Sequence, residues 1–92
     1  MQFEWDPEKD RRNQAKHGVS FEEASTIFGD PFALTISDPD HSLDENRLLT
    51  TGYSVRQRLI IAAHTDRGEA IRLISARDVS PAERRVYEEE PK

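Results

Sequence analysis

The segment Ile71-Arg-Leu-Ile-Ser-Ala-Arg-Asp-Val-Ser-Pro-Ala-Glu-Arg-Arg-Val-Tyr87 decides how the chain folds. Its first part is rich in β-branched and apolar residues, which predicts a buried strand over residues 71–76. A helix is predicted next, because Ser80 is a favourable N-cap, Pro81 suits the first helical position and Glu83 can close a capping box onto Ser80. The segment therefore joins a core strand to a capped helix.

Arginines are concentrated around this junction. They lie on the strand, at its end and on the helix, as Arg72, Arg77, Arg84 and Arg85. We interpret them as a surface that binds an anion, and RNA phosphate is the anion we favour, since arginine contacts phosphate through paired hydrogen bonds. The alternative is a set of surface salt bridges to Asp78, Glu83 and Glu88, each of which would contribute little to stability.

Composition indicates one soluble globular domain over residues 1–92 with a small core, since 35% of the residues are hydrophobic and 34% are charged. The lack of cysteine excludes a disulfide framework and a thiolate metal site. No apolar run approaches the roughly 20 residues of a membrane span. The N-terminal Met-Gln-Phe-Glu-Trp-Asp also lacks the features of a signal peptide. We therefore expect a cytoplasmic protein.

The net charge of −5 argues at first against binding to nucleic acid. Its distribution along the chain is uneven. Residues 1–45 carry four basic and eleven acidic side chains, whereas residues 46–87 carry eight basic side chains, all of them arginine, and four acidic ones. A basic second half made of arginine favours contact with phosphate or carboxylate groups.

The N-terminal half is predicted to form a strand and two helices. Residues 1–5 alternate, with Phe3 and Trp5 on one face. A helix should begin at Asp6-Pro7, end at Gly18 and carry a basic side composed of Lys9, Arg12, Asn13 and Lys16. A second helix should begin with a capping box between Ser20 and Glu23 and face the core through Phe21, Ala24, Ile27 and Phe28.

The second half is predicted to be mostly strand. Strands are expected over residues 32–37, 47–53, 59–65 and 71–76, with a loop over 38–45 and a hairpin turn over 66–69. Short links force neighbouring strands to be antiparallel. The expected fold is α+β: a small twisted antiparallel sheet with the two N-terminal helices on one face and a C-terminal helix.

The polar residues most suited to chemistry are Lys16, His17 and Tyr87. His17 is a candidate proton carrier, although cations at a helix C-terminus are also favoured by the helix dipole alone. Tyr87 either packs its ring against the sheet or transfers a proton or stacks on a base. His41 is interpreted as solvated and His64 as a half-buried, hydrogen-bonded residue. The three histidines lack metal-ligand spacing, so no metal is predicted.

Several motifs, in order and spacing, resemble those of the BrnT toxins. They are Phe3-Glu4-Trp5-Asp6-Pro7-Glu8-Lys9, Asn13, Lys16-His17-Gly18-Val19-Ser20-Phe21-Glu22-Glu23-Ala24, Ile74-Ser75-Ala76-Arg77 and Glu83-Arg84-Arg85-Val86-Tyr87. The resemblance implies a RelE-like ribonuclease fold and the toxin half of a type II toxin–antitoxin pair that inhibits translation and growth. It also implies a BrnA-like ribbon-helix-helix antitoxin. Two toxins and two antitoxins would form a complex that binds operator DNA and represses its own operon.

The resemblance also implies an active site, to which we add candidate RNA-binding residues and a hypothesis for the reaction. Its candidate catalytic residues are Lys16, His17, Arg58, Arg77 and Tyr87, and the segment 54–58 offers Arg56 as well as Arg58. Candidate RNA-binding residues are Lys9, Arg12, Arg72 and Arg84. The hypothesis is cofactor-free, metal-independent RNA cleavage that leaves a 2′,3′-cyclic phosphate and a 5′-hydroxyl, with arginines stabilising the transition state. The alternative is a non-catalytic protein-binding module of a toxin–antitoxin-like complex.

Overall fold

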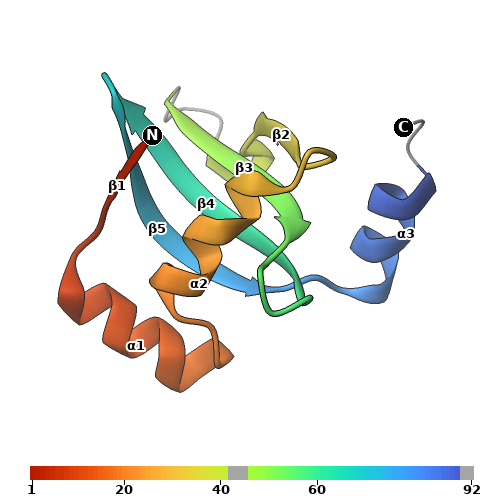
Figure 1. The fold of residues 1–92 in the computed structure, drawn as a ribbon, viewed down its shortest axis with the longest axis horizontal. Coiled ribbons are helices and arrows are strands. Elements are labelled where there is room, and N and C mark those ends of the chain that lie inside the picture. The colour runs from red at the N-terminus through yellow and green to blue at the C-terminus, as the bar shows by residue number, and fades with distance from the viewer. Residues whose placement is uncertain (42–45, 90–92) are drawn as a thin grey trace.

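The computed structural model describes residues 1–41 and 46–89, and the side chain of His41 lies outside the description. Figure 1 shows one twisted sheet with helices at its face and edges. The elements are β1 (Gln2–Glu4), α1 (Pro7–His17), α2 (Phe21–Ser25), the 3-10 helix η1 (Thr26–Gly29), β2 (Leu34–Ser37), the 3-10 helix η2 (Pro39–His41), β3 (Arg47–Tyr53), β4 (Leu59–Arg67), β5 (Ala70–Asp78) and α3 (Pro81–Glu89). No helix in the described residues is long and apolar enough to cross a membrane.

The sheet has the strand order β1-β5-β4-β3-β2. Strands β2 to β5 form the predicted antiparallel meander. The expectation of a wholly antiparallel sheet is wrong at one edge, where β1 runs parallel to β5 from the pair Gln2–Ala70 to the pair Glu4–Arg72. Most of the chain separates β1 from β5, so no short link forces these two strands to be antiparallel.

The helix starts follow the predicted caps, with one exception. The Asp6 side chain accepts a hydrogen bond from the Glu8 amide at 2.8 Å, and α1 ends at Gly18 with φ of 68°. In α3 the capping box is reciprocal: the Ser80 hydroxyl accepts from the Glu83 amide, and the Glu83 carboxylate accepts from the Ser80 amide.

The second predicted capping box is only half formed. The Ser20 hydroxyl accepts from the Glu23 amide at 3.0 Å, as expected for an N-cap. The Glu23 carboxylate, however, hydrogen-bonds Ser54 and Arg58 instead of turning back to Ser20. Because Arg58 of the β3–β4 turn is charged, its hydrogen bonds to the Glu23 carboxylate are favoured over the local bond to Ser20.

The core lies between the sheet and the segment that contains α2 and η1. Its buried side chains come from both layers: Val19, Phe21, Ala24, Ile27, Ile60, Ala62, Leu73 and Ala76. The predicted second helix changes to a 3-10 helix after Ser25, yet Ile27 still reaches the core. The close approach of η1 to β3 favours Gly52, because a Cβ there would crowd the Ile27 carbonyl oxygen at 3.1 Å.

Helix α1 lies at the edge of β5, whereas α2 crosses the face of the sheet (Figure 1). Asn13 holds it there. Its side chain donates to the carbonyl oxygens of Ala76 and Val19 at 2.7 and 2.8 Å and accepts from the Ala76 amide at 3.1 Å. Asn13 is thus buried, although it was predicted to lie with the basic residues on the surface of the helix.

Candidate functional site

A basic hollow of about 250 Å³ lies where α1 meets β5. It is lined by side chains of α1 and β5: Lys9, Arg12, Asn13, Lys16, His17, Ile74 and Ser75. The spacing of Lys9, Arg12 and Lys16 places them on one side of α1, as predicted. Because Asn13 fixes this side against β5, the cations converge on a single concave surface.

A β-bulge in β5 forms the opposite wall of the basic hollow. His64 pairs with Leu73 but Ala63 pairs with Ser75, so Ile74 is an extra residue in the register. Leu73 therefore reaches the core, while Ile74 and Ser75 line the hollow. Bulges commonly re-aim side chains beside functional sites. The sequence predicts a plain strand here, and nothing in its residue pattern indicates the bulge.

The cations of the basic hollow are largely without acidic partners. In the described part of the chain, no carboxylate forms an ion pair with Lys9, Lys16 or His17, and Arg12 approaches Glu8 only to 4.0 Å. The positive charge of Lys9, Arg12 and Lys16 is therefore available to a ligand. A concave site with several unpaired cations favours a polyanion such as a nucleic acid backbone.

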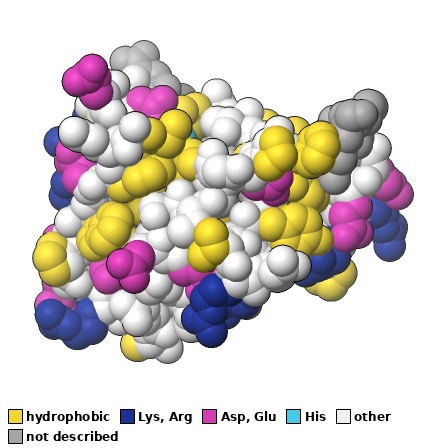
Figure 2. Space-filling view, viewed as in Figure 1, with side chains coloured by type: hydrophobic (Ala, Val, Ile, Leu, Met, Phe, Trp, Pro, Cys, Tyr) yellow, Lys and Arg dark blue, Asp and Glu magenta, His cyan; other side chains and the backbone are white. Residues whose placement is uncertain are grey.

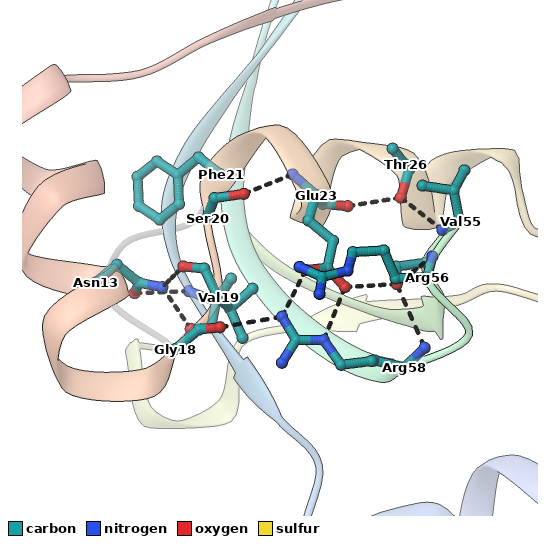
Figure 3. Close-up of polar contacts among 12 residues, drawn as sticks. Asn13, Gly18, Val19, Ser20, Phe21, Glu23, Thr26, Val55, Arg56 and Arg58 are labelled. Carbon is teal, nitrogen blue, oxygen red and sulfur yellow. Dashed lines mark hydrogen bonds and ion pairs between the residues drawn. The ribbon is translucent and has the colours of Figure 1, made fainter.

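Arg58 lies beside the end of α1 but is held by Glu23 (Figure 3). Its Nε and Nη2 donate to the two carboxylate oxygens of Glu23, and Nη2 also donates to the carbonyl oxygen of Gly18 at 3.0 Å. The hydrogen bond from Arg58 lowers the pKa of Glu23, so this carboxylate remains ionised. Arg56 lies 3.6 Å from Glu23 and does not form a pair of hydrogen bonds with its carboxylate as Arg58 does. Of the two arginines that the sequence offered, Arg58 is the one fixed next to His17-Gly18.

Arg77 lies on the other face of the sheet. Its neighbour Ala76 faces the core, so alternation along β5 directs Arg77 to the open face. There it forms a fork with Glu83, at 2.8 and 2.9 Å. Arg77 and Glu83 line an open-face groove of about 350 Å³ between the sheet and α3, together with apolar side chains such as Ile36.

Tyr87 anchors α3 beside the open-face groove. It is buried, and its hydroxyl donates to Asp30, which also accepts from the Tyr53 amide. Burial, and then the contact with Asp30, raises the pKa of Tyr87 above its ordinary value. The phenol therefore stays protonated, which favours the packing interpretation of this residue over proton transfer.

The remaining candidate arginines lie apart from the basic hollow and have acidic partners. Arg72 pairs with Glu4 of β1 at 2.9 Å. Arg84 donates to the Tyr53 hydroxyl at 3.2 Å and lies 3.7 Å from Glu88. Figure 2 likewise shows the Lys and Arg side chains of one face as separate groups at the periphery. The arginines thus do not converge on one pocket, and the predicted surface salt bridges account for several of them.

The histidines differ in their surroundings. His17 is half-buried in the basic hollow. His64 is more buried than predicted, with 2% of its surface exposed, and its Nε2 hydrogen-bonds the Thr50 hydroxyl at 2.7 Å. Burial lowers the pKa of His64. The side chain of His41, on which its interpretation depends, lies outside the description. In residues 1–41 and 46–89, no group of three or more histidine or acidic side chains is arranged to hold a metal ion.

The fold and the basic hollow define a small α+β protein with a cationic concave surface. A family model described as the ribonuclease toxin BrnT of a type II toxin–antitoxin system matches residues 5–83, and the chain belongs to this family. The protein is therefore a member of a ribonuclease toxin family, and this membership implies an RNA substrate and an antitoxin partner.

A solved structure supports this assignment. The crystal structure of the Brucella abortus ribonuclease toxin BrnT, at 1.1 Å resolution, is 26% identical in sequence and aligns with a TM-score of 0.69. The alignment covers 87% of this chain and 97% of the Brucella protein. No protein with curated annotation matches the chain significantly. The similarity of fold extends over nearly the whole domain.

Proposed function

We propose that the protein cleaves RNA at the basic hollow without a metal ion. The observation that carries this proposal is the convergence of Lys9, Arg12, Lys16 and His17 on one concave surface with almost no neutralisation by carboxylates. Lys9 and Arg12 bind backbone phosphates on either side of the reacting nucleotide. Lys16 and His17, at the end of α1, act at the scissile phosphate.

The proposed reaction is a transfer within the RNA. The ribose 2′-hydroxyl attacks the adjacent phosphorus, the bond to the 5′-oxygen of the next nucleotide breaks, and a 2′,3′-cyclic phosphate and a 5′-hydroxyl result. The 2′-oxygen loses a proton and the 5′-oxygen gains one. His17 is the proton carrier, because imidazole both accepts and donates protons near neutral pH. Lys16 stabilises the negative charge of the phosphorane.

Arg58 is the third proposed catalytic residue. Its guanidinium lies against the carbonyl of Gly18, the residue that follows His17. The ion pair of Arg77 with Glu83 and the burial of Tyr87, both beside the open-face groove, argue against these two residues as members of the same site. We assign these two residues to the attachment of α3.

The proposed biological setting is a toxin–antitoxin pair in the cytoplasm. Cleavage of RNA would inhibit translation and growth, and a BrnA-like ribbon-helix-helix antitoxin would neutralise the toxin in a 2:2 complex that binds operator DNA. Family membership supports an antitoxin partner in general. The resemblance of the sequence to the BrnT toxins supports this particular type of antitoxin.

The test is cleavage of an RNA oligonucleotide by purified protein in excess EDTA. We expect His17→Gln to lower kcat by about 100- to 10,000-fold, the usual contribution of a general acid or base. Lys16→Met should lower it by about 100- to 1,000-fold, as for the loss of a transition-state charge donor. The matched control is Arg11→Gln, because Arg11 lies on α1 next to Arg12 but pairs with Glu8 outside the basic hollow.

Three results would count against the proposal. Cleavage that EDTA abolishes would refute metal independence. Unchanged cleavage by both the Lys16 and the His17 variants would show that the active site lies elsewhere. If the wild-type protein binds an antitoxin tightly but no preparation cleaves RNA, the non-catalytic module becomes the better description.

A further inference from the structure

Glu23 is more buried and more fully bonded than the start of a helix requires. Only 5% of its side chain is exposed. Its carboxylate accepts hydrogen bonds from the Arg58 guanidinium and, at 2.7 Å, from the Ser54 hydroxyl. The same carboxylate could have completed the capping box with Ser20. In the structure the carboxylate therefore binds residues of the β3–β4 turn instead of capping α2.

The contact with Glu23 fixes the plane of the Arg58 guanidinium. The Nε–Nη2 edge faces the two oxygens of Glu23, and Nη2 has a further acceptor in the carbonyl of Gly18. Two separate partners on one edge leave the group little freedom to rotate. In Figure 3 this edge is directed at Glu23 and Gly18, on the side where α1 ends.

The third nitrogen of the guanidinium is left available. Nη1 makes no hydrogen bond to any described residue, and one-third of the Arg58 side chain is exposed. Arg58 remains charged in this arrangement, because the hydrogen bond to Glu23 raises its pKa. A guanidinium that is held by one edge can still donate two hydrogen bonds from Nη1 to an anion.

We propose that Glu23 is a positioning residue for RNA cleavage, which holds Arg58 so that Nη1 faces the scissile phosphate beside Lys16 and His17. This inference rests on the proposed function of the basic hollow. Glu23 does not touch the RNA; it acts through Arg58. A carboxylate is required because only two anionic oxygens can accept the Nε–Nη2 edge as a fork.

The competing interpretation is that Glu23 only braces α2 against the β3–β4 turn. A brace affects the free energy of unfolding but not the rate of the chemical step in folded protein. A positioning residue affects kcat while KM changes little, because the displaced group acts mainly in the transition state. Kinetics measured well below the melting temperature of each variant therefore separate the two roles.

The experiment compares Glu23→Gln with Glu22→Gln in single-turnover and steady-state cleavage of an RNA oligonucleotide. Glu22 precedes Glu23 on α2 and is exposed, so it controls for the loss of one charge. We expect Glu23→Gln to lower kcat by about 10- to 100-fold, the scale of a charged donor displaced by roughly 1 Å. KM should change by less than about threefold, since ground-state binding to Lys9 and Arg12 is retained.

A double-mutant cycle tests whether Glu23 acts through Arg58. In an Arg58→Ala background, Glu23→Gln should lower kcat no further. If Glu23→Gln fails to fold, Glu23→Asp replaces it, since aspartate keeps the buried charge but is too short for the same fork; a kcat equal to that of the wild type would overturn the proposal. The proposal would also be overturned if Glu23→Gln had the kcat of the wild type. It would likewise be overturned if Glu23→Gln lowered kcat as much in the Arg58→Ala background as in the wild type.

The two proposals fail in distinguishable ways. If the wild-type protein cleaves RNA and His17→Gln does not, the proposed function stands, and a fully active Glu23→Gln variant refutes only the positioning role. If the wild-type protein does not cleave RNA under any condition, both proposals are refuted together.

Discussion

Tyr87 shows how burial decides the role of a reactive side chain. Its ring packs edge-to-face against that of Tyr53, with centroids 5.7 Å apart, and its hydroxyl donates to Asp30. The raised pKa that results from burial and from Asp30 makes the phenol a poor base at neutral pH. These contacts attach α3 to β3 and to Asp30, the residue that follows η1.

We therefore predict that Tyr87→Phe affects stability rather than catalysis. The loss of a hydrogen bond to a charged acceptor should lower the free energy of unfolding by about 1.5–3 kcal/mol. The kcat for RNA cleavage should stay within about threefold of the wild type, since we place Tyr87 outside the proposed active site. Urea unfolding and single-turnover cleavage measure the two effects. A large fall in kcat at unchanged stability would instead identify Tyr87 as catalytic.

Sequence reasoning succeeded for residues whose roles depend on local spacing. Lys9, Arg12 and Lys16 share a side of α1 because of helical periodicity, and this side does line the basic hollow. The pairing of Glu23 with Arg58 spans 35 residues and was not predicted. Local rules assigned Glu23 to a capping box, since its competing partner is brought near only by the folded sheet.

At the scale of elements, α3 depends on a charged contact at its first turn. Glu83 accepts from the Ser80 amide and forms the fork with Arg77, and these bonds, chiefly that with Arg77, lower its pKa from 4.5 to about 2. Because the folded-state pKa lies below the unfolded value, this stabilisation is fully present above pH 4.5 and is lost as the pH falls toward about 2.

We predict that Glu83→Gln flattens the dependence of the melting temperature on pH between about 2 and 4.5. Glutamine can still accept from the Ser80 amide, so the substitution removes the charge and keeps the cap. Glu89→Gln is the control, because Glu89 lies in α3 but forms no ion pair in the described residues. If both variants keep the wild-type pH profile, the ion pair with Arg77 does not stabilise α3.

Strand and helix positions were predicted better than their arrangement. The strand expected over residues 47–53 coincides with β3, and caps at Asp6 and Ser80 mark the starts of α1 and α3. The parallel pairing of β1 and the extra residue Ile74 in β5 were missed. Both are properties of strand register, which depends on partners distant in the sequence and leaves no local signal.

At the scale of the whole molecule, the net charge of −5 conceals a cationic site. Arginines outside the basic hollow are mostly neutralised by acidic neighbours, as Arg72 is by Glu4 and Arg77 by Glu83. The hollow retains its charge because its residues face β5, which presents Ile74 and Ser75 rather than carboxylates. The site at which a polyanion can bind is therefore decided by which cations lack acidic partners, more than by the overall composition.

The concentration of unpaired cations in the basic hollow predicts that the affinity for RNA depends only modestly on salt concentration, and that this dependence arises from the residues of the hollow. Three or four cations in the hollow should give a slope of about −2 to −3 in a plot of log affinity against log salt concentration, at about −0.7 per phosphate contact with a single strand. Fluorescence anisotropy with an uncleavable 2′-deoxy oligonucleotide measures this slope.

Lys9→Gln should reduce the magnitude of the salt slope by about 0.7. Arg72→Gln should leave it unchanged, because Glu4 already neutralises Arg72. If Arg72→Gln reduces the slope and Lys9→Gln does not, RNA binds along the edge formed by β1 and β5 instead of at α1.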